Sequence, residues 1–217
     1  VDLATDILMK AGDYKAALEL SRQLLVEQPG VSRTYLIRAE VLEQAELPDE
    51  AYEVLRVGHL RFPDSIRISV AYAYRLEARG DWRGAVSIFE ELLTMRPGDP
   101  EIANFIGYTL ADNNADLERA LDLIEQAVAV EPDNPAYLDS LGWVYFRLER
   151  YEDALKHIRK AAEELPQDPV VSDHLIQVLI KTGALEEARK VMEEALNRHP
   201  CDPGLLKTKE LLEQVNR

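Results

Sequence analysis

The side chains that could carry out catalysis are few in this chain and poorly spaced for it. None of the four histidines has an HExxH or HxxxH partner, the spacings that place two metal ligands on one helix face. Cys201 lies two residues after His199, and side chains this close in a turn rarely orient each other for nucleophilic attack. A single cysteine also excludes an internal disulfide and a cysteine-based zinc site. We therefore expect no catalytic residue, no metal and no cofactor.

The remaining polar motifs also argue against an enzyme. No predicted strand leads into a glycine-rich loop of the kind that binds phosphate. The acidic pair Glu186 and Glu187 falls on a predicted exposed helix face, where Glu186 can pair with Lys190 one turn later. Acidic turns such as PDNP lack the alternating ligands of a calcium loop.

Composition narrows the class of partner. The chain has 217 residues, with 40 acidic against 25 basic side chains and a formal charge of -15. Such a charge repels phosphate backbones, so we expect no nucleic acid partner. No apolar run approaches the ~18 residues of a membrane span, so we expect no insertion of this segment into a membrane. The chain starts at Val1 without a signal segment, and we expect any targeting sequence to lie upstream.

The strongest pattern is an internal repeat of 34 or 35 residues. Prolines and alanines recur in phase, each alanine 12 residues before a proline. The prolines are Pro29, Pro63, Pro97, Pro132, Pro166 and Pro200, and the alanines are Ala17, Ala51, Ala85, Ala120, Ala154 and Ala188. The pattern predicts an array of helical repeats.

Each period predicts two amphipathic helices, as residues 135–168 illustrate. Apolar and small residues lie on one face of a first helix and on one face of a second. They are Leu138, Leu141, Gly142 and Tyr145, then Tyr151, Ala154, Ile158 and Ala161. The proline of each period should stop the second helix.

The turn between the paired helices has its own signature. Gly12, Gly80 and Gly183 recur there, which predicts a left-handed residue after the first helix. The one extra residue of the array falls in the fourth repeat, where Asn113 and Asn114 should lengthen this turn.

These repeats resemble tetratricopeptide repeats. The resemblance implies an all-α fold, a right-handed superhelical solenoid of antiparallel helix pairs. We expect a single domain over residues 1–217, with repeats 1–31 (incomplete), 32–65, 66–99, 100–134, 135–168 and 169–202 and a capping helix over 203–217. Repeat 32–65 departs from the family pattern at Arg38, Pro48 and Gly58.

The resemblance also implies where a ligand would lie, because the first helices of such repeats line a concave groove. One groove-facing position is aromatic in three consecutive repeats. Polar side chains occur at neighbouring groove positions. We expect the partner-binding residues to be Tyr74, Asn104, Tyr108, Asp139, Trp143, Phe146 and Arg147. Aromatic rings give apolar area, and amides can pair with a peptide backbone. The alternative is that these rings only pack adjacent helices.

Two features restrict the partner. Carboxylate-clamp cochaperones of this family carry lysine at a groove position that here reads Asp2, Leu36, Val70, Asn104, Asp139 and Asp173. Binding of a chaperone tail is therefore not expected. Acidic residues outnumber basic ones in the groove positions, which favours a neutral or basic partner segment.

Residues 104–161 are similar to a group of Gram-negative tetratricopeptide proteins, several of them outer-membrane lipoproteins that face the periplasm. One type binds a carboxyl-terminal processing protease and brings substrates to it. The resemblance implies a non-catalytic scaffold for a protein or peptide partner. Two alternatives stay open: a regulatory or targeting domain of a larger enzyme, such as a glycosyltransferase, and a self-associating assembly factor. The cytoplasm is the alternative location to the periplasm.

Overall fold

The computed structural model describes residues 2–215 and contains, over that range, thirteen helices and no strand. Residues 1, 216 and 217, at the outer limits of the incomplete first repeat and the predicted capping helix, lie outside the described residues. The all-α prediction is confirmed. None of the described helices is both long and apolar enough to span a bilayer.

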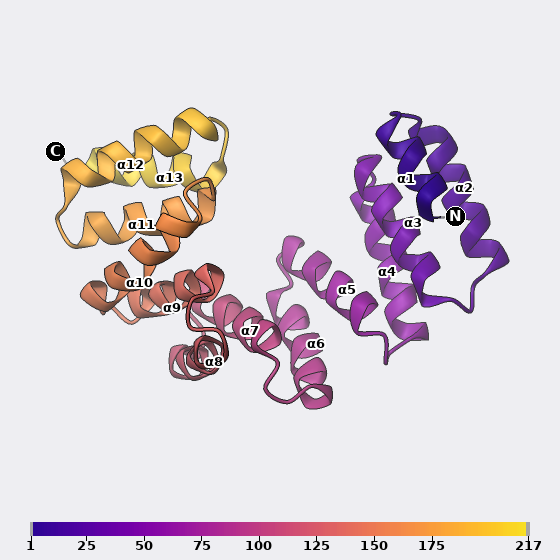
Figure 1. Ribbon diagram of the computed structural model, residues 1–217, viewed down its shortest axis with the longest axis horizontal. Coiled ribbons are helices and arrows are strands. Elements are labelled where there is room, and N and C mark those ends of the chain that lie inside the picture. Colours follow the sequence, from indigo (N-terminus) through magenta and orange to yellow (C-terminus); the bar gives the residue numbers. More distant parts are fainter. Residues whose placement is uncertain (1, 216–217) are drawn as a thin grey trace. The chain divides into compact units, whose positions relative to one another are not determined.

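The chain divides into two compact units at Met95 and Arg96, and each is described by itself. The first unit holds three helix pairs (Figure 1). They are α1 (Asp2–Lys10) with α2 (Tyr14–Glu27), α3 (Ser32–Gln44) with α4 (Pro48–Arg61), and α5 (Ile66–Ala78) with α6 (Trp82–Met95).

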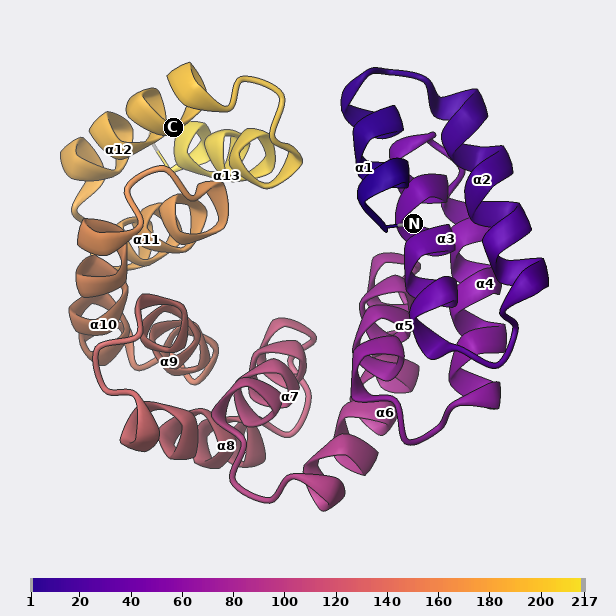
Figure 2. The same ribbon diagram turned by 45° about the vertical axis from the view of Figure 1, so that its right-hand side comes forward.

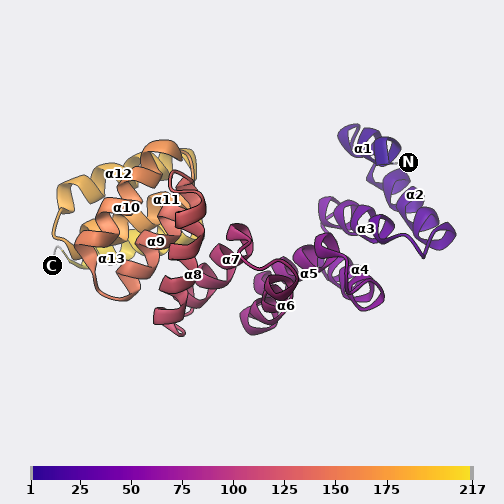
Figure 3. The same ribbon diagram turned by 60° about the horizontal axis from the view of Figure 1, so that its bottom comes forward.

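The second unit holds three further pairs and a last helix, which Figures 2 and 3 show from two other directions. They are α7 (Pro100–Asp112) with α8 (Leu117–Val130), α9 (Pro135–Arg147) with α10 (Tyr151–Glu164), α11 (Pro169–Lys181) with α12 (Leu185–Arg198), and α13 (Pro203–Gln214). Helix α13 packs on α11 and α12. Its role as a cap, like the single-domain description, stays a prediction.

The repeat boundaries follow from local capping chemistry. Every complete repeat begins at the first residue of a helix, and in the second unit that residue is always proline. Proline suits this position because its missing N–H has no partner inside the helix and its φ is already helical. The preceding aspartate or asparagine accepts the free N–H groups of the first turn. Asp99, for example, accepts from the N–H of Glu101 at 3.1 Å.

The second helices end as predicted. Each stops two residues before the proline of its period, as α10 does at Glu164 before Pro166. The turn between paired helices also follows the prediction, with Gly12, Gly80 and Gly183 at φ between 75° and 83°. In the turns without glycine, a residue with a side chain adopts the same left-handed backbone conformation, which is strained for such residues. Glu46, Asn114 and Glu149 have φ of 59°, 51° and 61°.

The core of each unit is built on the phased alanines. All six, from Ala17 to Ala188, are fully buried, because each lies where a second helix crosses its partner first helix. Gly142 in α9 shows how close this crossing is. A methyl group added there would lie 2.3 Å from Cγ1 of Ile158 and 3.0 Å from the backbone oxygen of Ala154.

The departures of repeat 32–65 have local compensations. Arg38 replaces an apolar residue, and its guanidinium donates to the backbone oxygen of Leu18 at 2.6 Å and to Oγ of Ser21 at 3.1 Å. Pro48 opens α4, where a proline is favoured. Gly58 is buried and lies against the side chain of Tyr35, so that a methyl group added there would lie 3.1 Å from Cβ of Tyr35.

Replacing Gly142 by alanine should destabilise the second unit. Forcing a methyl group into a packed crossing costs about 1–3 kcal/mol, and the gain in helix propensity returns only about 1 kcal/mol of that. Urea unfolding followed by circular dichroism should show the loss. Gly30→Ala, at a site with nothing within 4 Å of the added carbon, is the control and should leave stability unchanged or slightly raised. An unchanged midpoint for Gly142→Ala would contradict the close crossing.

The packing of α9 on α10 also predicts a pH effect. Burial lowers the pKa of His157, with Lys156 adding to the shift, and its ring lies 5.7 Å from that of Tyr145. A lowered folded pKa means that protonation favours the unfolded chain, so this contribution to stability is present above the unfolded value of about 6.5 and is lost as the pH falls. A proton NMR titration, with His157→Gln to identify the resonance, should give a midpoint below that value. A midpoint at or above it would refute the assignment.

Candidate aromatic binding site

The candidate site of the second unit is a stack of three rings contributed by two first helices. Trp143 of α9 lies between Phe146 of the same helix and His174 of α11. The ring centroids are 4.9 Å apart on the Phe146 side and 4.0 Å apart on the His174 side, and the planes deviate by only 9° and 14°. Tyr108 of α7 approaches His174 at 6.1 Å. Three successive first helices therefore meet at one cluster.

A buried hydrogen-bonded pair, His174 with Asp139, holds this stack in place. Nδ1 of His174 donates to both carboxylate oxygens of Asp139, at 2.9 and 3.0 Å. His174 and Asp139 are only 4% and 5% exposed, so both groups are largely removed from water and depend on each other for hydrogen bonding. The pair joins α9 to α11 and fixes the face that His174 presents to Trp143.

The edge of the stack is polar. The indole Nε1 of Trp143 donates to Oδ1 of Asp112 at 3.2 Å, across from α9 to α7. The guanidinium of Arg147 lies 5.6 Å from the indole centroid, within the range of a cation–π contact. Every polar atom of the indole is thus satisfied, and the ring of Trp143, 4% exposed, is part of the packing.

The stack opens at Phe146 onto an apolar hollow of about 270 Å³ between α9, α11 and α13. Its lining residues are Phe146, Gln177, Ile180, Lys181, Leu211, Gln214 and Val215. Phe146 is half-buried, while Leu211 on the last helix and Val215 directly after it are exposed apolar side chains. This hollow is the part of the site that an incoming side chain could enter.

The sequence-predicted residues are not all brought together. Tyr108, Asp139, Trp143, Phe146 and Arg147 belong to the cluster around His174. Asn104 lies on α7, and its side-chain oxygen is shielded from solvent and accepts no hydrogen bond among the described residues. Tyr74 belongs to the first unit, where it is 41% exposed and meets Phe89 edge-on at 5.9 Å.

Sequence reasoning missed two parts of this site. It counted His174 only among the four histidines without a metal-binding partner, although Asp139 and His174 are the fifth and sixth residues of two successive repeats, a spacing that could have suggested the contact. It assigned Leu211 and Val215 only to a cap, and their contribution to the hollow depends on how α13 packs against α11. Among the described residues, no three side chains of histidine, cysteine, aspartate or glutamate are grouped as metal ligands.

Comparisons with known proteins agree with this architecture. The tetratricopeptide repeat family matches residues 5–58 and 109–169, and further profiles of the same repeat match residues 68–102 and 145–210. The TPR repeat-containing protein PA4667 of Pseudomonas aeruginosa is 31% identical over 155 residues. That match covers 71% of this chain and 26% of the relative, so the chain spans about a quarter of the relative's length.

Solved structures show the same fold at low sequence identity. The type IV pilus biogenesis factor PilW has a TM-score of 0.74 at 18% identity, with 94% of each chain covered. A tetratricopeptide repeat protein of Parabacteroides merdae has a TM-score of 0.79 at 13% identity, covering 98% of this chain and 84% of that one. PilF of Pseudomonas aeruginosa has a TM-score of 0.70 at 14% identity, covering 96% and 95%.

Removing the carboxylate of Asp139 should destabilise the second unit. Asp139→Ala leaves the buried imidazole of His174 without its acceptor, and an unsatisfied buried polar group costs about 1–3 kcal/mol. Urea unfolding followed by circular dichroism measures the change. Asp133→Ala, which removes a solvent-exposed carboxylate paired with Lys160, should have little effect. Equal losses for the two variants would show that the Asp139–His174 pair does not stabilise the stack.

Proposed function

Since this chain belongs to the tetratricopeptide repeat family, whose members bind protein partners, we propose that it is a non-catalytic scaffold that binds a peptide segment at the aromatic site of its second unit. The observation that carries the proposal is the apolar hollow beside Phe146. A rigid stack ends there in a half-buried ring, and an incoming apolar side chain would cover that ring and the exposed Leu211 and Val215.

The residues of the site divide into two roles in this proposal. Tyr108, Phe146 and Arg147 are half-buried and contact the partner directly. Trp143 and Asp139 are buried, and they hold those side chains in place through the stack and the bond to His174. Rigid aromatic anchors lose little side-chain entropy on binding, so a small contact of this kind can carry much of the affinity.

Asn104 enters the proposal as an additional contact of the aromatic site, and Tyr74 enters it as a separate candidate contact within the first unit. The shielded side-chain oxygen of Asn104 has no donor among the described residues, and the backbone N–H of a bound peptide could supply one after a small side-chain rotation. Tyr74 offers exposed ring area in the first unit.

The narrower role, an adaptor that brings substrates to a carboxyl-terminal processing protease at the periplasmic side of the outer membrane, is a hypothesis from the resemblance of residues 104–161. The second candidate function is a targeting or regulatory domain of a larger protein. It is supported by the match to a longer relative, of which this chain spans about a quarter. Both candidates use the same peptide-binding surface.

Affinity capture from an extract of the source organism, followed by mass spectrometry, tests the proposal. The paired change Phe146→Ala and Arg147→Ala should lower recovery of a bound partner about tenfold or more, the loss expected when an anchor worth at least 1.4 kcal/mol is removed. The matched control is Val130→Ala with Lys156→Ala, two exposed side chains of the second helices α8 and α10. Circular dichroism first confirms that both variants are folded.

Two outcomes of this capture would contradict the proposal: partners recovered equally by the anchor variant and the control, or no partner specific to the unmodified chain. A protease among the captured partners would support the narrower adaptor role.

A further inference from the structure

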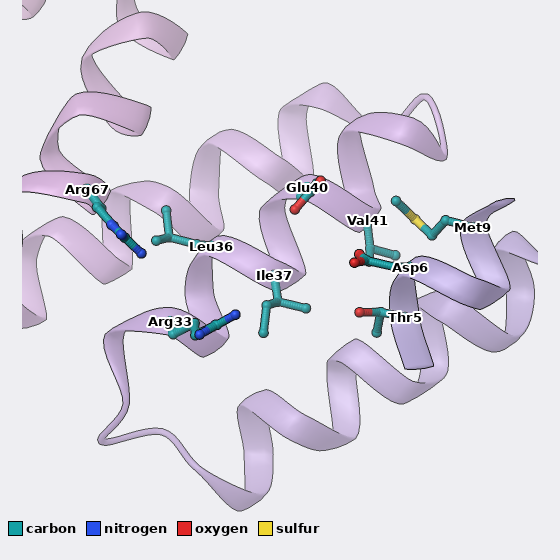
Figure 4. A pocket seen from close by; sticks show the side chains of 9 residues that line it. All are labelled: Thr5, Asp6, Met9, Arg33, Leu36, Ile37, Glu40, Val41 and Arg67. Atoms are coloured by element: carbon teal, nitrogen blue, oxygen red, sulfur yellow. The ribbon is translucent and has the colours of Figure 1, made fainter. Parts of the chain in front are cut away.

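The first unit contains a second hollow, which none of the predicted site residues line. It has a volume of about 270 Å³ and lies on the first helices α1, α3 and α5 (Figure 4). Its lining residues are Thr5, Asp6, Met9, Arg33, Leu36, Ile37, Glu40, Val41 and Arg67. We call it the charged trough.

The floor of the charged trough is apolar. Leu36, Ile37 and Val41 lie along α3, and Met9 adds the end of its side chain from α1. Val41 and Met9 are buried in the core of this unit, while Leu36 is half-buried and offers surface for contact. An apolar side chain of a ligand would therefore find a preformed surface between the charged walls.

Opposite charges lie at opposite ends of the charged trough. Figure 4 shows Arg33 and Arg67 at one end, with their side chains directed toward Ile37 and Leu36. Asp6 lies at the other end with its carboxylate facing the hollow, and Glu40 lies along the wall between Leu36 and Val41. The arginines occupy the first turns of α3 and α5, where the helix dipole adds to their positive potential.

Three of the four charged side chains of the charged trough are not paired by the fold. Within the described part of the chain, Asp6, Glu40 and Arg67 take part in no ion pair and no hydrogen bond of their side chains. Many of the exposed charges elsewhere are paired within or between helices, as Arg22 is with Glu19. Arg33 and Glu40 are seven residues apart on α3, which corresponds to about 10 Å along the helix axis.

We propose that the charged trough binds an amphipathic helical segment of a protein partner with an acidic residue at one end, an apolar centre and a basic residue at the other end. On a helix, residues i and i+7 lie on one face about 10 Å apart, and i+3 and i+4 lie between them. The acidic side chain then meets Arg33 and Arg67, the apolar pair covers Leu36 and Ile37, and the basic side chain meets Asp6 and Glu40.

This site is independent of the aromatic site, because it lies in the other compact unit. The charged trough also modifies the sequence-based expectation that the partner segment is neutral or basic. That expectation rests on the sum of the charges at the groove positions. The charged trough instead selects a ligand by the order and spacing of its acidic and basic side chains.

Synthetic peptides test the proposal directly. Fluorescein-labelled, acetylated and amidated alanine-rich helices carry glutamate at i, leucine at i+3 and i+4, and lysine at i+7. A matched peptide replaces both charges by glutamine, and a third exchanges glutamate and lysine. Fluorescence anisotropy should show at least one of the two charged orders binding about tenfold more tightly than the neutral peptide, the equivalent of 1.4 kcal/mol.

Charge-reversal variants test whether Arg33 and Arg67 bind the acidic end of the peptide. Arg33→Glu with Arg67→Glu should weaken the preferred peptide about tenfold or more and should bind a peptide with lysine at both ends better than the unmodified chain does. The control is Lys15→Glu with Arg61→Glu, two exposed side chains of α2 and α4 that carry the same change in net charge. It should bind the parent peptide nearly as well as the unmodified chain.

The Phe146→Ala, Arg147→Ala variant should bind these peptides unchanged, which separates this inference from the proposed function. The inference is overturned if the neutral peptide binds as tightly as both charged ones, if no peptide binds, or if the control reversal is as damaging as that of Arg33 and Arg67. Circular dichroism confirms that each variant is folded before binding is measured.

Discussion

The structure depends on the close crossing of paired helices at one small residue per repeat. The six phased alanines are fully buried, and at Gly142 even a methyl group has no room. At such a crossing one helix lies close to the backbone of the other, so close van der Waals packing of the two helices, with few flexible side chains between them, sets their relative position. Larger side chains can then vary on the remaining faces of each first helix without moving the backbone that carries them.

That freedom is used differently in the two units. In the second unit, rings and a buried Asp139–His174 bond join successive first helices into a stack that ends at an apolar hollow. In the first unit, the equivalent surface keeps its charges apart at the two ends of an apolar trough. One repeat architecture thus offers two chemically different surfaces, which suits a scaffold with more than one contact to its partners.

Most of the fold was predictable because it is encoded locally. Proline after aspartate or asparagine starts the first helices of the second unit, and a proline two residues beyond each second helix marks its end. Glycine marks the left-handed turn in three of the six helix pairs. Contacts between repeats were not predictable in the same way. A periodic pattern treats every repeat alike, but the bond from Asp139 to His174 depends on two rotamers and the offset of two helices. Arg38 likewise departs from the apolar pattern of its position. The sequence did not predict that its guanidinium donates to the backbone oxygen of Leu18 and to Oγ of Ser21.

The two tryptophans of the chain are distributed one to each compact unit. Trp82 lies in the first unit with the guanidinium of Arg83 4.1 Å from its ring, and Trp143 lies in the second between an imidazole and a benzyl ring. Trp82 is half-buried and Trp143 is 4% exposed, so we expect the two indoles to differ in emission maximum. Each compact unit therefore has its own intrinsic fluorophore. Variants with a single tryptophan would show whether the two units unfold together or one after the other.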